Sequence, residues 1–139
     1  MSLTFQVSFD ADDPPRLARF WAAALGYESQ PPPEGFDSRP AFAESVGLAA
    51  DEAENFAALT DPEGRRPRLF FQKVPEGKVA KNRIHLDVNA GAPDHDWSKV
   101  TAHVELLRAR GGTIVEERTD EMSRWIVMLD PEGNEFCVQ

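Results

Sequence analysis

A tetrapeptide that occurs twice is the feature that most restricts how this chain can fold. Asp-Pro-Glu-Gly stands at 61–64 and again at 130–133, and each copy separates two segments rich in apolar residues. The tetrapeptide is favourable turn chemistry, because proline fixes one φ angle and glycine accepts a left-handed one. A single repeat of this kind could arise by chance, so its meaning depends on the elements around it.

The elements that open the two halves occur in the same order. In the first half, residues 3–10 alternate apolar and polar side chains, which predicts a strand. A helix should follow, capped by Asp13 and ended by Gly26. In the second half the same pattern predicts a strand over 83–89, and a helix marked by apolar residues from Trp97 to Leu107.

The elements that close the two halves also correspond. We expect strands at 56–60, 68–74, 113–117, 124–129 and 136–139, a loop at 30–39, and one or two short helices within 41–57. An internal duplication is the better explanation of this order. The fold class is therefore α+β, a single domain over 1–139 with module one at about 1–76 and module two at about 77–139.

Charge and cysteine content limit the classes of partner and the cellular compartment that we expect for this chain. The formal net charge of −9 argues against nucleic acid and against anionic lipid, both of which need a basic surface. No apolar run is long enough to cross a membrane, and no signal peptide is evident. The single cysteine, Cys137, fits a reducing compartment, so we expect a cytoplasmic protein. A small molecule is the simplest partner class that remains.

Three motifs in order give the chain a family resemblance. The segment 13–27, which runs from Asp-Pro-Pro-Arg-Leu-Ala-Arg-Phe-Trp to Leu-Gly-Tyr, resembles the first helix of glyoxalase-like proteins. The segments 81–87 and 130–136 resemble their second opening strand and closing hairpin. The chain thus resembles the glyoxalase/bleomycin-resistance/dioxygenase superfamily, also called vicinal oxygen chelate. The resemblance implies two βαβββ modules with curved mixed sheets around a cavity, helices on the outer faces, and a possible homodimer.

The resemblance also implies four metal-ligand positions, two on the opening strands and two on late strands. They fall on Gln6, Gln72, His85 and Cys137. Divalent metals usually take carboxylates or several imidazoles. These four residues include only one imidazole and no carboxylate, so a full ligand set is absent. A divalent metal is still possible, with His85, Gln6 and Gln72 as its candidate ligands.

Several side chains are candidates for contact with a small molecule, although each also has an ordinary structural explanation. His85 could be a hydrogen-bonded strand histidine or an acid/base group. Cys137 is more often a small buried hydrophobe than a nucleophile. Phe70 shares the face of Gln72, and Trp125 could be core or a cavity wall. The predicted ligand-contacting residues are Gln6, Phe70, Gln72, His85, Trp125 and Cys137.

Two functions remain open. The first is an enzyme of the lyase, isomerase or dioxygenase type that uses His85 as its catalytic residue. The second is a binding protein without catalysis, similar to the drug-sequestering members of the superfamily. The four implied ligand positions carry no carboxylate, which favours the second function, whereas His85 keeps the first open.

Overall fold

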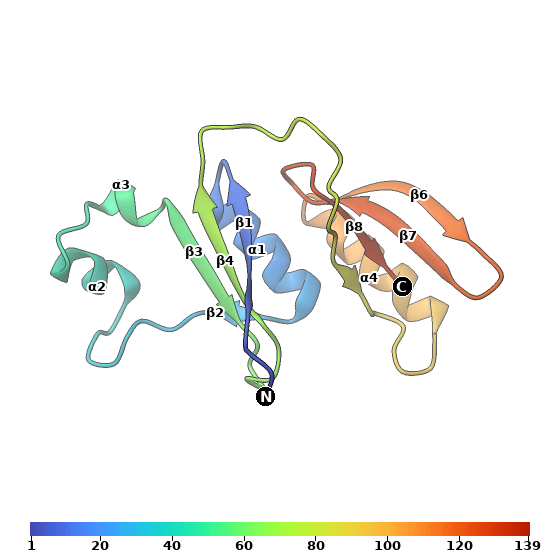
Figure 1. The fold of residues 1–139 in the computed structure, drawn as a ribbon, viewed down its shortest axis with the longest axis horizontal. Helices are drawn as coiled ribbons and strands as arrows, with labels where there is room; N and C mark the ends of the chain where they lie inside the picture. Colours follow the sequence, from blue (N-terminus) through green and yellow to red (C-terminus); the bar gives the residue numbers. More distant parts are fainter. The chain divides into compact units, whose positions relative to one another are not determined.

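Two four-stranded mixed sheets with helices make up the computed structural model, which describes all residues 1–139 (Figure 1). The chain divides into two compact units. Unit 1 comprises Met1–Ala22 and Gly26–Gly77, and unit 2 comprises Ala23–Leu25 and Lys78–Gln139. Neither sheet closes into a barrel, and the strand orders are β1-β4-β3-β2 and β5-β8-β7-β6. This repeated order confirms the predicted α+β fold of two βαβββ modules.

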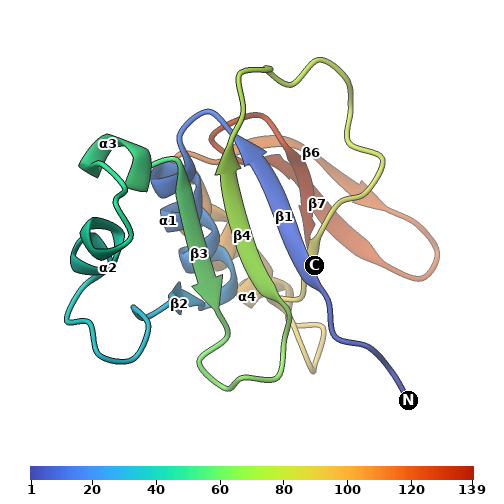
Figure 2. The same cartoon turned by 60° about the vertical axis from the view of Figure 1, so that its left-hand side comes forward.

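Unit 1 has a parallel pair of strands next to an antiparallel hairpin. Strands β1 and β4 run parallel, and β3 pairs antiparallel with both β4 and β2 (Figure 2). One or two short helices were predicted within 41–57; α3 lies within this range, and α2 begins two residues before it, at the end of the predicted loop. The elements are β1 (Gln6–Ala11), α1 (Pro14–Leu25), β2 (Glu28–Ser29), α2 (Arg39–Ser45), α3 (Ala50–Ala53), β3 (Phe56–Thr60) and β4 (Arg68–Lys73).

Unit 2 repeats this arrangement with one helix. Strand β5 is parallel to β8, and β7 pairs antiparallel with both β8 and β6. The elements are β5 (Asp87–Val88), α4 (Trp97–Ala109), β6 (Thr113–Thr119), β7 (Arg124–Leu129) and β8 (Glu135–Val138). None of the helices in either unit is both long and apolar enough to traverse a bilayer.

Helix α1 begins and ends at the predicted residues. The Asp13 carboxylate accepts a hydrogen bond from the Arg16 backbone N–H, and Gly26 takes a left-handed φ of 68° at the C-terminal end. Leu17 and Trp21 are buried, and the Trp21 ring centroid lies 5.2 Å from that of Phe9 on β1. The apolar side of the helix therefore packs onto one face of the unit 1 sheet (sheet 1), which leaves the opposite face available for polar side chains.

The repeated tetrapeptide forms a turn anchored by its own aspartate. Asp61 and Asp130 are both buried, and each carboxylate accepts backbone N–H groups from the turn that follows it. Burial acts to raise the pKa of Asp61, but hydrogen bonds from the backbone N–H groups of Glu63, Arg65 and Arg66 and the nearby Arg66 charge outweigh it, so the pKa lies below its ordinary value. The motif is thus structural in both units.

The predicted strand over 83–89 is wrong in length, because only Asp87–Val88 forms β5. The Asn82 backbone N–H donates to the Glu135 carboxylate, 2.9 Å away, rather than to a backbone carbonyl. Backbone pairing with β8 is seen only from Leu86, whose carbonyl accepts from the Cys137 N–H. Ile84 lies before β5, outside this pairing, and is 87% exposed.

Candidate functional site

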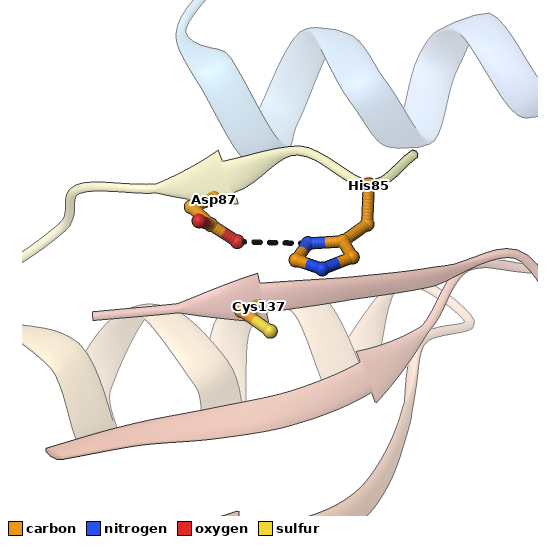
Figure 3. A group of neighbouring side chains, drawn as sticks. All are labelled: His85, Asp87 and Cys137. Atoms are coloured by element: carbon orange, nitrogen blue, oxygen red, sulfur yellow. Dashed lines mark hydrogen bonds and ion pairs between the residues drawn. The ribbon is translucent and has the colours of Figure 1, made fainter. Parts of the chain in front are cut away.

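Three chemically reactive side chains meet where strands β5 and β8 of unit 2 run side by side. Asp87 on β5 is paired with Cys137 on β8, and His85 lies two residues before Asp87. The His85 Nδ1 atom lies 3.1 Å from the Asp87 carboxylate, and Figure 3 shows the Cys137 sulfur beside this pair. The potential ligand atoms of the three residues all lie within 4.8 Å of one another. We refer to His85, Asp87 and Cys137 as the triad cluster.

The electrostatic environment keeps the thiol of the triad cluster protonated. Burial raises the pKa of Cys137, and the Asp87 charge together with a thiol hydrogen bond to Asp87 raises it further. Lys81 and Arg118 act in the opposite direction but do not overcome these effects. Because the thiolate is the nucleophilic form, Cys137 is poorly suited to covalent catalysis in this state.

A cavity of about 660 Å³ lies over the sheet of unit 2 beside the triad cluster. The alternation of β7 supplies its apolar wall, since Trp125 and Val127 line the cavity whereas Ile126 and Met128 are buried. The lining residues are Lys81, His85, Asp87, Val115, Glu116, Arg118, Asp120, Ser123, Trp125, Val127, Leu129, Glu135, Phe136, Cys137 and Gln139. This volume is within the range of pockets that take small organic molecules.

A bulge in β6 contributes to the same wall. The register between β6 and β7 shifts between Ile114 and Glu116, so that Val115 has no partner on β7. Val115 lines the cavity and is half exposed. A bulge of this kind bends a strand and redirects a side chain, and here the redirected side chain adds apolar surface.

Glu135 fixes the segment that leads into the triad cluster. Its carboxylate accepts hydrogen bonds from the Asn82 N–H at 2.9 Å and from Lys78 Nζ at 3.2 Å. The Asn82 hydrogen bond is the main reason that the pKa of Glu135 falls to about 2; burial opposes it and Lys78 adds to it. Glu135 thereby ties residues 78–82 to the start of β8. This segment ends three residues before His85.

The predicted site residues of unit 1 lie on one face of sheet 1. The Gln6 side-chain oxygen accepts a hydrogen bond from Arg68 Nη1 at 2.8 Å, and the Gln72 amide donates to Asp10 at 2.8 Å. The Phe70 ring is stacked with Phe56, with centroids 5.9 Å apart. The Arg68 guanidinium lies 5.1 Å above the Phe70 ring. These contacts involve only residues of unit 1.

Strand register shows which residues correspond between the units. Cys137 is paired with Asp87, two residues after His85, and Phe70 is paired with Ser8, two residues after Gln6. With Gln6 matched to His85, Phe70 therefore holds the place that Cys137 has in unit 2. Gln72 lies two residues after Phe70 on β4, opposite Asp10. The same register matches Phe56 with Trp125, so an aromatic ring recurs on the third strand of each module.

The metal ligands implied by the resemblance do not form a strong donor set. The amides of Gln6 and Gln72 already bond to Arg68 and Asp10, and amide oxygens are weak ligands for transition metals. His85 and Cys137 are strong ligand types, and Asp87 supplies the carboxylate that the predicted set lacks. Alternation along the predicted strand 83–89 places Asp87 on the same polar face as His85, but the sequence did not identify Asp87 as a candidate ligand.

Comparison with known proteins agrees with the observed fold. A family model described as a glyoxalase-like domain matches residues 6–139. Among curated proteins, none matches the sequence.

Solved structures with the same fold have very different sequences. A glyoxalase/bleomycin resistance protein/dioxygenase family enzyme from Burkholderia phytofirmans PsJN has a TM-score of 0.61 and 18% identity, covering 96% of this chain and 94% of that one. The fosfomycin resistance protein FosX from Listeria monocytogenes has a TM-score of 0.65 and 11% identity, covering 99% and 92%. The bleomycin-binding protein of Streptomyces verticillus, solved with copper(II)-bleomycin, has a TM-score of 0.55 and 19% identity, covering 100% and 96%. At these identities the likeness concerns the fold alone.

Proposed function

The chain belongs to the glyoxalase-like domain family, and on this premise we propose that it binds a small organic molecule in the cavity of unit 2. The observation that carries the proposal is the juxtaposition in that cavity of an apolar wall with the triad cluster. Pockets for small molecules combine such apolar surface with a few polar groups that fix orientation. Two structural neighbours are named for small molecules, fosfomycin and bleomycin, which makes these compounds reasonable first probes.

The lining predicts what the ligand should look like. Trp125, Val115 and Val127 offer a partly exposed apolar surface, which suits a ring or an unsaturated carbon framework. When the His85 Nδ1–H donates to Asp87, Nε2 is left as an acceptor. A hydroxyl or another donor on the ligand would pair with it. We therefore expect a partly apolar molecule that carries at least one oxygen-bearing polar group.

A second candidate function follows from the hydrogen bond between His85 and Asp87. A carboxylate beside Nδ1 orients the imidazole and fixes the tautomer in which Nε2 can accept a proton, which is the arrangement that a general base needs. His85 could then move a proton to or from a bound substrate in a lyase or isomerase reaction. The raised pKa of the neighbouring thiol makes Cys137 a less suitable catalytic group than His85.

A thermal-shift screen tests the binding proposal. Small oxygenated molecules, with fosfomycin and bleomycin among them, are added to the purified chain, and hits are titrated by calorimetry. Replacing Trp125 or His85 by alanine should weaken a hit about tenfold each, which corresponds to about 1.4 kcal/mol. The control variant is His95→Asn, because His95 lies in an exposed loop outside the cavity lining.

Two results would decide against this location. If a hit binds with the same affinity to Trp125→Ala, His85→Ala and the control, the ligand binds elsewhere on the chain. If affinity fell instead in Gln6→Ala, Phe70→Ala or Gln72→Ala alone, the face of sheet 1 would be the ligand site.

To test the enzyme alternative, turnover of a hit is followed by NMR, and turnover that persists in His85→Ala would remove His85 as the proton carrier.

We also propose a cytoplasmic location and a homodimer. The location is supported by the lone cysteine, whose free thiol suits a reducing compartment. The homodimer is supported by the resemblance to proteins that pair their modules between chains. Light scattering after gel filtration tests the dimer, and a monomer mass at working concentration would exclude it. Fractionation of expressing cells tests the location.

A further inference from the structure

The triad cluster combines three of the strongest metal-ligand types found in proteins. His85 offers an imidazole nitrogen, Asp87 a carboxylate oxygen and Cys137 a sulfur, and the three atoms lie within 4.8 Å of one another. Asp87 and Cys137 extend from the adjacent strands β5 and β8, and His85 extends toward them from the segment just before β5 (Figure 3). We infer that His85, Asp87 and Cys137 form a site for one zinc-type divalent ion that lies wholly within unit 2.

The distances are close to those of a tetrahedral centre. Zinc bonds of about 2.0 Å to nitrogen or oxygen and about 2.3 Å to sulfur place ligand atoms about 3.3–3.5 Å apart. His85 Nδ1 and Asp87 Oδ1, at 3.1 Å, are already close to this spacing. The sulfur lies no more than 4.8 Å from the other two ligand atoms, so it would need to approach by about 1.3 Å at most, which a side-chain rotation supplies. The backbone pairing of Asp87 with Cys137 holds two of the three ligands in place.

The donor types also select the metal. A thiolate with an imidazole suits zinc and cobalt, whereas magnesium and calcium prefer oxygen ligands throughout. The charges of one thiolate and one carboxylate would balance a divalent cation. Three protein ligands leave one tetrahedral position, and His85, Asp87 and Cys137 all line the cavity. An oxygen atom of a ligand in the cavity could therefore reach the ion.

This site differs from the arrangement implied by the family resemblance. It includes Asp87, which none of the four implied positions contains, and it omits Gln6 and Gln72. The oxygen of Gln6 already accepts a hydrogen bond from Arg68, and Gln72 is held to Asp10 through its amide nitrogen. Metal binding measured on variants of these residues separates the two arrangements.

Cobalt titration of the tag-free, chelator-treated protein provides the test. We expect one Co²⁺ per chain and a near-ultraviolet sulfur-to-cobalt charge-transfer band, which zinc displaces and excess magnesium does not. Cys137→Ser should abolish the band. His85→Ala and Asp87→Asn should each raise the cobalt dissociation constant at least about tenfold, because even second-shell partners have effects of that size. Gln6→Ala, Gln72→Ala and His95→Asn should leave it unchanged.

Three outcomes would overturn the inference. They are the absence of a charge-transfer band at millimolar cobalt, affinity that survives both His85→Ala and Asp87→Asn, and affinity that falls in Gln6→Ala or Gln72→Ala. Far-ultraviolet circular dichroism of each variant checks that it is folded. The site lies in the cavity of the proposed function, but cobalt is titrated without an organic ligand. The metal proposal and the binding proposal can therefore fail independently.

Discussion

The ionised carboxylate of Glu135 should make unit 2 more stable above about pH 4.5 than at pH 2. The backbone N–H of Asn82 and the Lys78 ammonium group both favour the charged form, which lowers the pKa from 4.5 to about 2. A proton therefore binds less readily in the folded chain than in the unfolded one. The resulting stabilisation is fully present above about pH 4.5 and is lost as the pH falls toward 2.

The structure sets the magnitude of this effect. Each pKa unit corresponds to about 1.4 kcal/mol, so the upper limit is about 3 kcal/mol. The Glu135 side chain is 20% exposed, and solvent screening at such a position reduces the expected value to about 1–2 kcal/mol. In Glu135→Gln the free energy of unfolding should fall by this amount at pH 7, and the difference from the unaltered protein should vanish near pH 2.

Urea unfolding followed by tryptophan fluorescence at several pH values between 2 and 7 measures this difference. Glu105→Gln is the matched control, because Glu105 forms only an exposed ion pair with Arg108 and its loss should cost less than about 0.5 kcal/mol. A deficit in Glu135→Gln that stays constant from pH 7 to 2 would refute the reasoning. Such a result would assign the effect to lost side-chain shape rather than to charge.

Two further predictions concern the turn and the thiol. Asp130→Ala should lower the free energy of unfolding by about 2 kcal/mol, because the buried carboxylate accepts hydrogen bonds from Glu132 and Asn134. Asp94→Ala, in an exposed loop, serves as the control. Urea midpoints that are the same for Asp130→Ala and Asp94→Ala would contradict the prediction. Cys137 should react slowly with iodoacetamide at pH 8, and Asp87→Asn should speed the reaction, since removing the Asp87 charge lowers the pKa of the thiol. An unchanged rate in mass-spectrometric time courses would show that Asp87 does not control the thiol.

The fold was predictable from the sequence because local signals agreed with the repeat. The Asp13 cap, the Gly26 terminator and the alternation of β7 each specify an element without reference to distant residues. The strand at 83–89 was predicted too long, because alternation cannot show whether a partner strand is present. That information depends on Glu135, which lies more than fifty residues away and takes the Asn82 N–H. The module boundaries near residue 76 remain a prediction.

The site was predictable in part. His85, Trp125 and Cys137, chosen from the sequence, line one cavity in unit 2. Asp87 was expected on the polar face of His85 but not as a ligand, because its proximity to Cys137 arises from the pairing of β5 with β8. Such cross-strand neighbours can be inferred only once the register is known. The roles of Gln6, Phe70 and Gln72 in ligand binding stay predictions, since the structure shows where they lie but not what they bind.

The two units share one frame and differ in the chemistry at equivalent positions. Where unit 2 has His85 and Cys137, unit 1 has Gln6 and Phe70. The imidazole and the thiol can bind a metal or transfer a proton, whereas the amide is a weak metal ligand that mainly forms hydrogen bonds and the phenyl ring can only stack. The exchanged side chains lie on one face of each sheet, whereas the other face carries buried apolar residues in both units. The face that bears reactive groups is thus separate from the face that packs the core, and only unit 2 has such groups at these positions, which is why we place both proposals in unit 2.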